Sequence, residues 1–202
     1  MRLAAATKNE GKTRELRAMF ADCADGNGNA YELLSMGDLG IDADVVEDAD
    51  TFEGNALKKA EAVMRLCGEI TIADDSGLCV EALGGAPGVY SARYSGAGAT
   101  DSRNNEMLLK HMEHQTNRNA KFVCVIAVVF PDGGSATVRG ELRGQIAYGV
   151  SGTGGFGYDA LFYLPQYGKT AAEIPQDLKN RISHRGQAVA ALKEYLARLG
   201  MV

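Results

Sequence analysis

The stretch from Lys121 to Phe130 is a long run of apolar, largely β-branched residues, and it constrains the fold more than any other segment. Such a run predicts a buried strand. The turn sequence from Pro131 to Gly134 leads into a second strand pattern from Ala136 to Leu142. The middle of the chain is therefore expected to form an antiparallel hairpin.

The first third of the chain instead alternates strands with helices. A short apolar segment from Arg2 to Thr7 precedes a helical pattern, and a second helix begins near Asp50 or Thr51, either of which can cap it. The apolar run from Glu69 to Ala73 is then expected to be a buried strand that ends at Asp74. Together with the hairpin, this order predicts a mixed α/β sheet rather than a purely parallel one.

Composition narrows the classes of function. The 202 residues carry a net charge of −5 and are 46% apolar, which suits a folded globular protein and argues against binding to duplex nucleic acid. The four cysteines form no CxxC pair, and no leader or membrane-length apolar run is visible. We expect a single domain over 1–202, in a cytoplasmic protein.

The loop from Thr7 to Lys12 lies between a strand pattern and a helix pattern. A glycine-containing loop at a helix N-terminus presents N–H groups to an anion, and Lys12 would add a positive charge. The segment differs by one residue from a phosphate-binding P-loop, which needs glycine where this chain has Ala6. A solvated polar loop before an ordinary helix explains the same residues.

A group of carboxylates is the second feature. Asp74, Asp75 and Ser76 follow the predicted strand, and Glu47 precedes the second helix. Mg²⁺ prefers such hard oxygen ligands together with substrate phosphates, and one carboxylate could deprotonate a water. Asp-Asp-Ser-Gly is also good turn chemistry on any surface.

The second helix carries Asn55 and Lys59 one turn apart, so they share a face. Close to the carboxylates, they could contact a phosphate and the water shell of a metal. A solvated helical face explains the pair equally well.

Two segments near the C-terminus are candidates for binding a base. Phe156 is flanked by glycines, so its ring could lie flat against a base, and Asp159 could accept hydrogen bonds from the base edge. His184 and Arg185 are expected at a solvent-facing helix N-terminus, where positive charge is unfavourable unless an anion or a carbonyl-rich base is near. Lys179 shortly precedes them.

Taken together, these segments resemble the non-canonical purine nucleoside triphosphate pyrophosphatase family (inosine/xanthosine triphosphate pyrophosphatases, Ham1-like). The resemblance spans nearly the whole chain, and the motifs occur in family order. The matching stretches are ATKNEGK, E-x-x-x-TFEGNALKKA, IADDSGLCVEALGGAPGVYSARYSG, TGGFGYDALF, and GKTAAE followed by ISHRG.

The resemblance implies an elongated mixed β-sheet flanked by helices, two lobes with the active site in the cleft between them, and a homodimer. It also implies Mg²⁺-dependent hydrolysis of ITP, dITP or XTP to the monophosphate and pyrophosphate, which clears deaminated purines from the nucleotide pool. Asp75 would be the catalytic base and, with Glu47, a metal ligand. The implied substrate-binding residues are Thr7, Lys8, Asn9, Glu10, Gly11, Lys12, Asn55, Lys59, Ser76, Phe156, Gly157, Tyr158, Asp159, Lys179, His184 and Arg185.

Three other functions compete with this one. A P-loop phosphotransferase or γ-phosphate hydrolase would release orthophosphate, and Ala6 argues against it. A Maf-like pyrophosphatase would favour pyrimidine or modified nucleotides, and the SHRG and FGYD segments argue against it. A non-enzymatic nucleotide-binding or nucleic-acid-binding module conflicts with the acidic balance and the clustered carboxylates.

Overall fold

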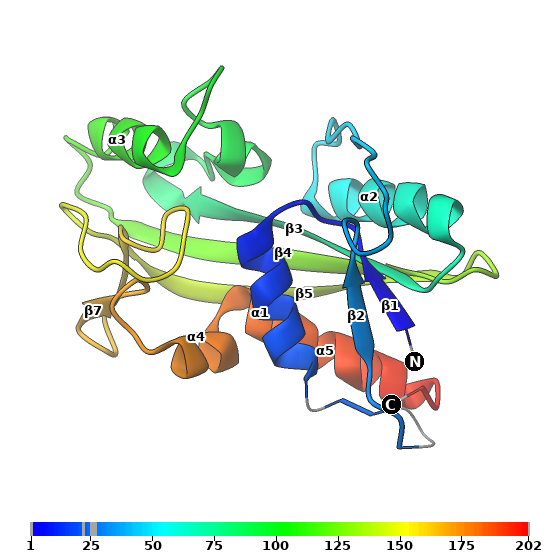
Figure 1. Ribbon diagram of the computed structural model, residues 1–202. Helices are drawn as coiled ribbons and strands as arrows, with labels where there is room; N and C mark the ends of the chain where they lie inside the picture. Colours follow the sequence, from blue (N-terminus) through cyan, green and yellow to red (C-terminus); the bar gives the residue numbers. More distant parts are fainter. Residues whose placement is uncertain (1, 22, 25–27, 202) are drawn as a thin grey trace. The chain divides into compact units, whose positions relative to one another are not determined.

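A computed structural model describes residues 2–21, 23–24 and 28–201, and within these residues it has one seven-stranded mixed sheet flanked by helices (Figure 1). The strands pair in the order β2-β1-β3-β4-β5-β6-β7. Strand β1 pairs in parallel with β2 and β3, whereas β6 pairs antiparallel with β5 and β7. The predicted mixed α/β fold is confirmed. The strands are β1 (Arg2–Ala5), β2 (Glu32–Ser35), β3 (Thr71–Val80), β4 (Asn119–Val129), β5 (Ser135–Ile146), β6 (Phe162–Leu164) and β7 (Lys169–Thr170).

The chain divides into two compact units, which share the three long central strands. Unit 1 contains Met1–Asp75, Cys124–Gly140 and Arg185–Val202, and unit 2 contains Ser76–Val123 and Glu141–His184. The helices are α1 (Glu10–Phe20), α2 (Phe52–Cys67), α3 (Asp101–His111), α4 (Gln176–Ile182) and α5 (His184–Arg198), with two 3-10 helices, η1 (Glu81–Leu83) and η2 (Gly88–Arg93). No helix of the described residues is both long enough and apolar enough to span a bilayer.

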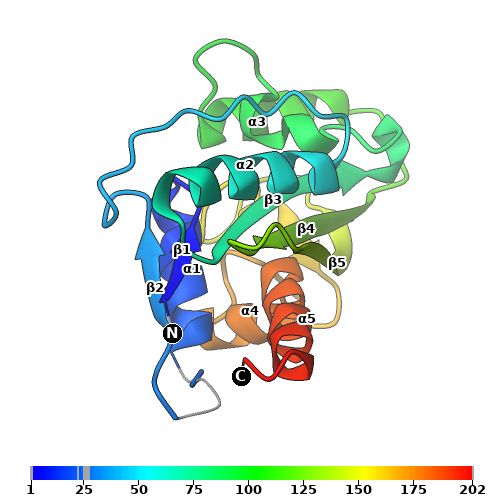
Figure 2. The ribbon, with the colours of Figure 1, turned by 90° about the vertical axis from the view of Figure 1, so that its right-hand side faces the viewer.

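Unit 1 is layered around its part of the sheet. Figure 2 shows α2 on one face of these strands and α5 on the other. The core beneath α1 and α5 joins Leu16 and Phe20 to strand residues such as Ile72 and Ile126, and to Leu192 of α5. On α2, the residues Ala56, Ala60 and Val63 are fully buried. The two faces of β3 are therefore covered by different helices.

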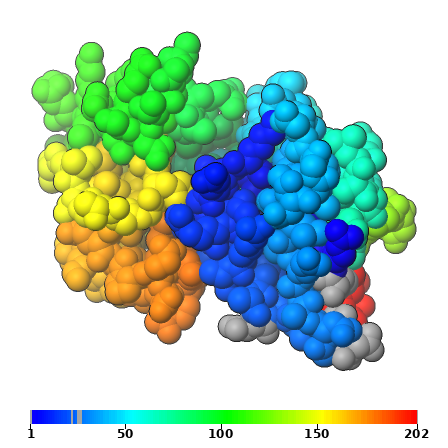
Figure 3. Space-filling model, in the orientation of Figure 1, coloured from blue at the N-terminus to red at the C-terminus, as the bar shows by residue number. Residues whose placement is uncertain are grey.

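Capping residues fix where the helices of unit 1 begin. Asn9 precedes α1, and its side chain accepts a hydrogen bond from the Lys12 N–H at 3.0 Å. Thr51 precedes α2 and accepts from the Gly54 N–H at 3.1 Å. Of the two caps that the sequence allows for α2, the structure therefore has Thr51. Before it, residues 41–50 form neither helix nor strand and lie at the surface of unit 1 (light blue in Figure 3).

Thr51→Ala is expected to lower the free energy of unfolding by about 1 kcal/mol, because it leaves a helix N–H without its side-chain acceptor. Asp50→Ala is the matched control, since it removes the neighbouring candidate cap and should cost less. Urea unfolding of both variants measures the difference. Equal losses in the two variants would contradict the assignment of the cap.

Unit 2 has a separate core under α3. Leu108 and Met112 of that helix pack with Leu78 and Val80 of β3 and with Phe162 of β6. Within this unit the end of β5 is hydrogen-bonded to the residue that precedes β4, the Ile146 N–H donating to the Arg118 carbonyl at 2.8 Å.

The predicted hairpin is confirmed. It turns between Phe130 and Gly134, where the Phe130 N–H donates to the Gly134 carbonyl at 2.8 Å. The prediction that a strand ends at Asp74 is wrong, because β3 continues through the Asp-Asp-Ser-Gly sequence to Val80. These residues favour a turn at a protein surface, but here they stay in the strand because the segment is buried and its charged side chains have partners on neighbouring helices. The sequence reading also left out β2, β6, β7 and α4.

Candidate active site

Asp74 and Asp75 lie in the middle of β3, with only 1% and 4% of their surface exposed. Consecutive side chains of a strand point to opposite faces of the sheet. The carboxylate of Asp74 accordingly contacts Lys12 of α1 and Arg185 of α5, whereas that of Asp75 contacts Asn55 of α2. The two adjacent carboxylates therefore lie on opposite faces of the sheet and contact different helices.

Asp74 is the centre of a buried ionic network. Its Oδ2 lies 3.0 Å from Lys12 Nζ and 3.0 Å from Arg185 Nη2. Arg185 Nη1 in turn lies 2.5 Å from Glu15 Oε2. Burial works against ionisation of Asp74, but the nearby charges of Lys12, Arg185 and Lys59 hold its pKa well below the usual range. Burial likewise opposes the charge of Arg185, whose pKa is nonetheless raised by Asp74 and Glu15.

Asp75 has a different balance of charges. Asn55 Nδ2 donates to Asp75 Oδ2 at 3.1 Å, and Lys59 Nζ lies 3.7 Å from Asp75 Oδ1. The same Lys59 Nζ lies 3.1 Å from Glu47 Oε1 and donates to the Asp74 carbonyl at 2.8 Å. Burial is the largest effect on Asp75 and raises its pKa. The charge of Glu47 raises it further, while Lys59 and Lys12 lower it.

Glu47 and Asp75 fit a site for a hard divalent cation. The two carboxylates share one lysine and are close enough for Glu47 to affect the pKa of Asp75, so a bound cation would relieve their repulsion. No group of three or more potential metal ligands occurs among the described residues. One or two carboxylates are enough for Mg²⁺ when substrate phosphates and waters complete its shell.

The loop from Thr7 to Lys12 leads into α1 as predicted, with Glu10 and Gly11 in the first turn of the helix. Thr7 Oγ1 accepts the Asn9 N–H at 3.2 Å, which orders the approach to the helix. The ammonium group of Lys8 is held at the surface by Asp42 at 2.8 Å and Asp44 at 2.7 Å. Within this loop it is therefore Lys12 that lies with the buried carboxylates.

Unit 2 contains the second group of predicted residues. Asp159 Oδ2 accepts the Phe156 N–H at 2.9 Å and the ammonium of Lys179 at 2.7 Å. The same ammonium lies 5.1 Å from the centre of the Phe156 ring, a cation–π distance. Tyr158 is buried and donates its hydroxyl hydrogen to the Ser91 carbonyl at 2.8 Å. The structure therefore brings Phe156, Asp159 and Lys179 together, whereas the Tyr158 hydroxyl contacts Ser91.

The prediction that His184 and Arg185 face solvent is wrong, since they are 7% and 2% exposed. The His184 ring stacks on Phe122 of β4 in unit 2, with centroids 4.7 Å apart and planes 16° apart. Arg185 belongs to unit 1, where its guanidinium contacts Asp74 and Glu15. Contact of Arg185 with a purine stays a prediction. Ser76, the first residue of unit 2, is half-buried in β3.

The family model of the Ham1 family matches residues 3–195. The chain belongs to the Ham1 family. Similar relatives include the dITP/XTP pyrophosphatases of Geobacter sulfurreducens, 48% identical over 99% of this chain and 98% of the relative, and of Desulforamulus reducens, 46% identical over 98% and 97%.

Solved structures of Ham1 proteins share the fold. The Staphylococcus aureus Ham1 protein superposes with a TM-score of 0.85 at 40% identity and covers 98% of each chain. A Ham1 protein from Coxiella burnetii gives a TM-score of 0.87 at 35% identity, covering 98% of this chain and 99% of the other. Both likenesses extend over nearly the entire chain.

Glu15 and Phe122 are residues of this Ham1 protein that the sequence reading missed. Each fixes a predicted residue: Glu15 contacts Arg185, and Phe122 stacks on His184. A signal for Glu15 was present, because it lies one helical turn after Lys12 and beside the apolar Leu16. Phe122 looked like ordinary core in an apolar strand, and nothing in the sequence pairs it with His184.

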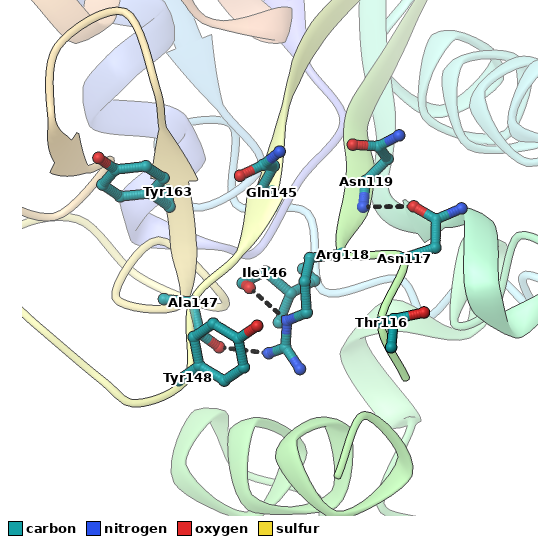
Figure 4. Close-up of a pocket in the computed structure, with 9 residues that line it drawn as sticks. All are labelled: Thr116, Asn117, Arg118, Asn119, Gln145, Ile146, Ala147, Tyr148 and Tyr163. Atoms are coloured by element: carbon teal, nitrogen blue, oxygen red, sulfur yellow. Dashed lines mark hydrogen bonds between the residues drawn. The ribbon is translucent and has the colours of Figure 1, made fainter. Parts of the chain in front are cut away.

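A cavity of about 600 Å³ in unit 2 contains none of the predicted site residues (Figure 4). It lies beside Arg118, which donates to the carbonyls of Ile146, Met112 and Ala147. The Tyr148 ring covers the guanidinium at 4.4 Å. Arg118, which directly precedes β4, thus joins the end of β5 to the end of α3, and this role is structural.

Proposed function

We propose that this protein hydrolyses deaminated purine nucleoside triphosphates (ITP, dITP and XTP) to the monophosphate and pyrophosphate, and so clears them from the nucleotide pool. The observation that carries the proposal is the grouping of Asp75, Glu47 and Lys59 beside Lys12 at the N-terminus of α1. This arrangement offers two carboxylates for a metal and two lysines for a triphosphate. Relatives named dITP/XTP pyrophosphatases support the substrate class.

Mg²⁺ is the proposed cofactor, with Glu47 and Asp75 as its protein ligands. When bound, it would offset the charge of the phosphates that repels an attacking water. Lys59 contacts both proposed ligands, so its ammonium would also be available to a phosphate oxygen bound next to them. Thr7, Asn9 and Gly11, with the first N–H groups of α1, would complete the triphosphate site.

Asp75 is the proposed general base. Its carboxylate is buried in β3, and the amide of Asn55 holds it in one orientation at 3.1 Å. It would take a proton from the water that attacks the α-phosphorus. The bond to the bridging oxygen then breaks, and Lys12 and Lys59 would stabilise the charge on the departing pyrophosphate. No covalent intermediate is needed.

The purine would be bound by unit 2. Phe156 offers its ring face, and Gly157, Tyr158, Asp159, Lys179 and His184 form its surroundings. Hypoxanthine and xanthine carry an oxygen at position 6 where adenine has an amino group. Hydrogen-bond donors of the site would donate to this oxygen, whereas adenine would leave a donor unpaired, at a cost of about 1–3 kcal/mol. Backbone N–H groups and Lys179 of unit 2 are the proposed donors.

Turnover of ITP, XTP, ATP and GTP with Mg²⁺ tests the proposal, provided that pyrophosphate and orthophosphate are separated among the products. We expect pyrophosphate from ITP and XTP, little from ATP or GTP, and no turnover when a chelator removes the metal. Orthophosphate as the product would instead indicate a P-loop type of hydrolase. Equal use of ATP would refute the proposed base recognition.

A homodimer and a cytoplasmic location are further parts of the proposal. Light scattering coupled to size-exclusion chromatography tests the first. Fractionation of the cells that produce the protein tests the second.

A further inference from the structure

Gly157 is held at both of its backbone polar groups by one helix of unit 2. Its N–H donates to Asp101 Oδ2 at 2.7 Å, and its carbonyl accepts from Asn105 Nδ2 at 3.0 Å. Asp101 and Asn105 are one turn apart on α3, so both side chains project from the same face of the helix. Contacts to both sides of one residue fix the orientation of its two peptide planes.

The orientation of Gly157 determines where its neighbours lie. Phe156 precedes it, and Asp159, two residues later, accepts the Phe156 N–H and holds Lys179 over the phenylalanine ring. Gly157 itself has φ +62°, in the left-handed region. Glycine has many accessible conformations, so this one needs outside contacts to be maintained. The contacts from α3 supply them.

Asn105 lowers the stability of the core in which it is buried. It is 8% exposed, and no described protein group donates a hydrogen bond to its buried Oδ1. A buried acceptor without a donor destabilises the folded state, and an apolar side chain of similar size would avoid that cost. A residue kept at a cost to stability is expected where function requires it.

We propose that Asp101 and Asn105 are positioning residues for purine recognition, which act by holding Gly157 and thereby Phe156 and Asp159. The inference rests on the proposed function, because it requires that the base of the substrate binds at Phe156. Both side chains bond to the backbone of Gly157, so their removal should affect binding of the base and spare the phosphate chemistry.

The test compares two substrates: ITP, and ribose 5-triphosphate, which has no base. Asp101→Ala and Asn105→Ala are expected to lower kcat/KM for ITP by about 10–100-fold, mainly through KM. Turnover of ribose 5-triphosphate should stay at the wild-type level. Asp101→Asn should restore ITP turnover, because its amide oxygen can still accept the Gly157 N–H.

Ser102→Ala is the matched control on α3, since the Ser102 hydroxyl donates to the exposed Glu106 side chain of the same helix, and we expect wild-type kinetics. Equal losses with both substrates, or no loss with ITP, would overturn the inference while leaving the proposed function intact. Wild-type protein that releases no pyrophosphate from ITP refutes the proposed function itself. If Asp101→Ala does not fold, Asn105→Ala provides the same comparison.

Discussion

Asp75→Asn is expected to lower pyrophosphate release from ITP by at least about 100-fold, because it removes the proposed general base and one proposed metal ligand. The amide oxygen of the new side chain can still accept the hydrogen bond from Asn55, so the local structure should persist. Steady-state assays with ITP and Mg²⁺ measure the loss. Asp48→Asn is the control. Asp48 is an exposed carboxylate on the same loop as Glu47, and it pairs with Lys58 of α2. Wild-type turnover in Asp75→Asn would exclude Asp75 as the base.

The same variant should keep or increase the stability of the protein. An acid whose pKa is raised by folding favours the folded state at low pH, and that contribution is lost as the pH rises through the folded pKa. At neutral pH the buried charge of Asp75 is therefore unfavourable relative to an exposed aspartate. Asparagine carries no charge and avoids this cost. Thermal unfolding with a chelator present measures the effect without metal binding.

The sequence predicts the parts of the fold that depend on local chemistry. The hairpin around Pro131, the start of α2 and the loop before α1 follow from turn residues, caps and apolar periodicity. The course of β3 does not follow, because Asp-Asp-Ser-Gly favours a turn unless distant groups neutralise its charges. Lys12 and Arg185, which do so for Asp74, lie 62 and 111 residues away in the chain. Short segments such as β7, of two residues, carry too little pattern to be seen.

The residues of the candidate site likewise include some that the sequence predicts and some that it does not. Asn55 and Lys59 could be chosen from their spacing on one helix, and the structure places both beside Asp75. Arg185 could be selected as important from the sequence, but its pairing with Glu15 could not be predicted, because the two residues lie far apart in the chain. Side chains that act through another residue, such as Phe122 beneath His184, have no distinguishing residue type. Their roles depend on tertiary contacts that one sequence does not contain.

Asp74→Asn is expected to have the opposite effect on stability from Asp75→Asn, with a loss of about 3–5 kcal/mol at pH 7. Breaking a buried ion pair leaves the remaining charges uncompensated, and here both Arg185 and Lys12 lose their shared carboxylate. Activity should fall as well, because Lys12 is no longer held near the proposed phosphate site. Denaturant unfolding at several pH values measures the loss.

The dependence on pH identifies the cause of that loss. Folding lowers the pKa of Asp74, so its contribution is complete above the unfolded pKa of about 3.9 and declines as the pH falls below that value. The gap between wild type and Asp74→Asn should therefore narrow by about 1.4 kcal/mol per pH unit below pH 4. A gap that stays constant with pH would indicate lost packing rather than lost charge. The triple variant Glu15→Gln, Asp74→Asn, Arg185→Met leaves neither Glu15 nor Arg185 as an unpaired buried charge, so it should recover part of the stability that Asp74→Asn loses. It should not restore turnover, because Lys12 still lacks its carboxylate partner.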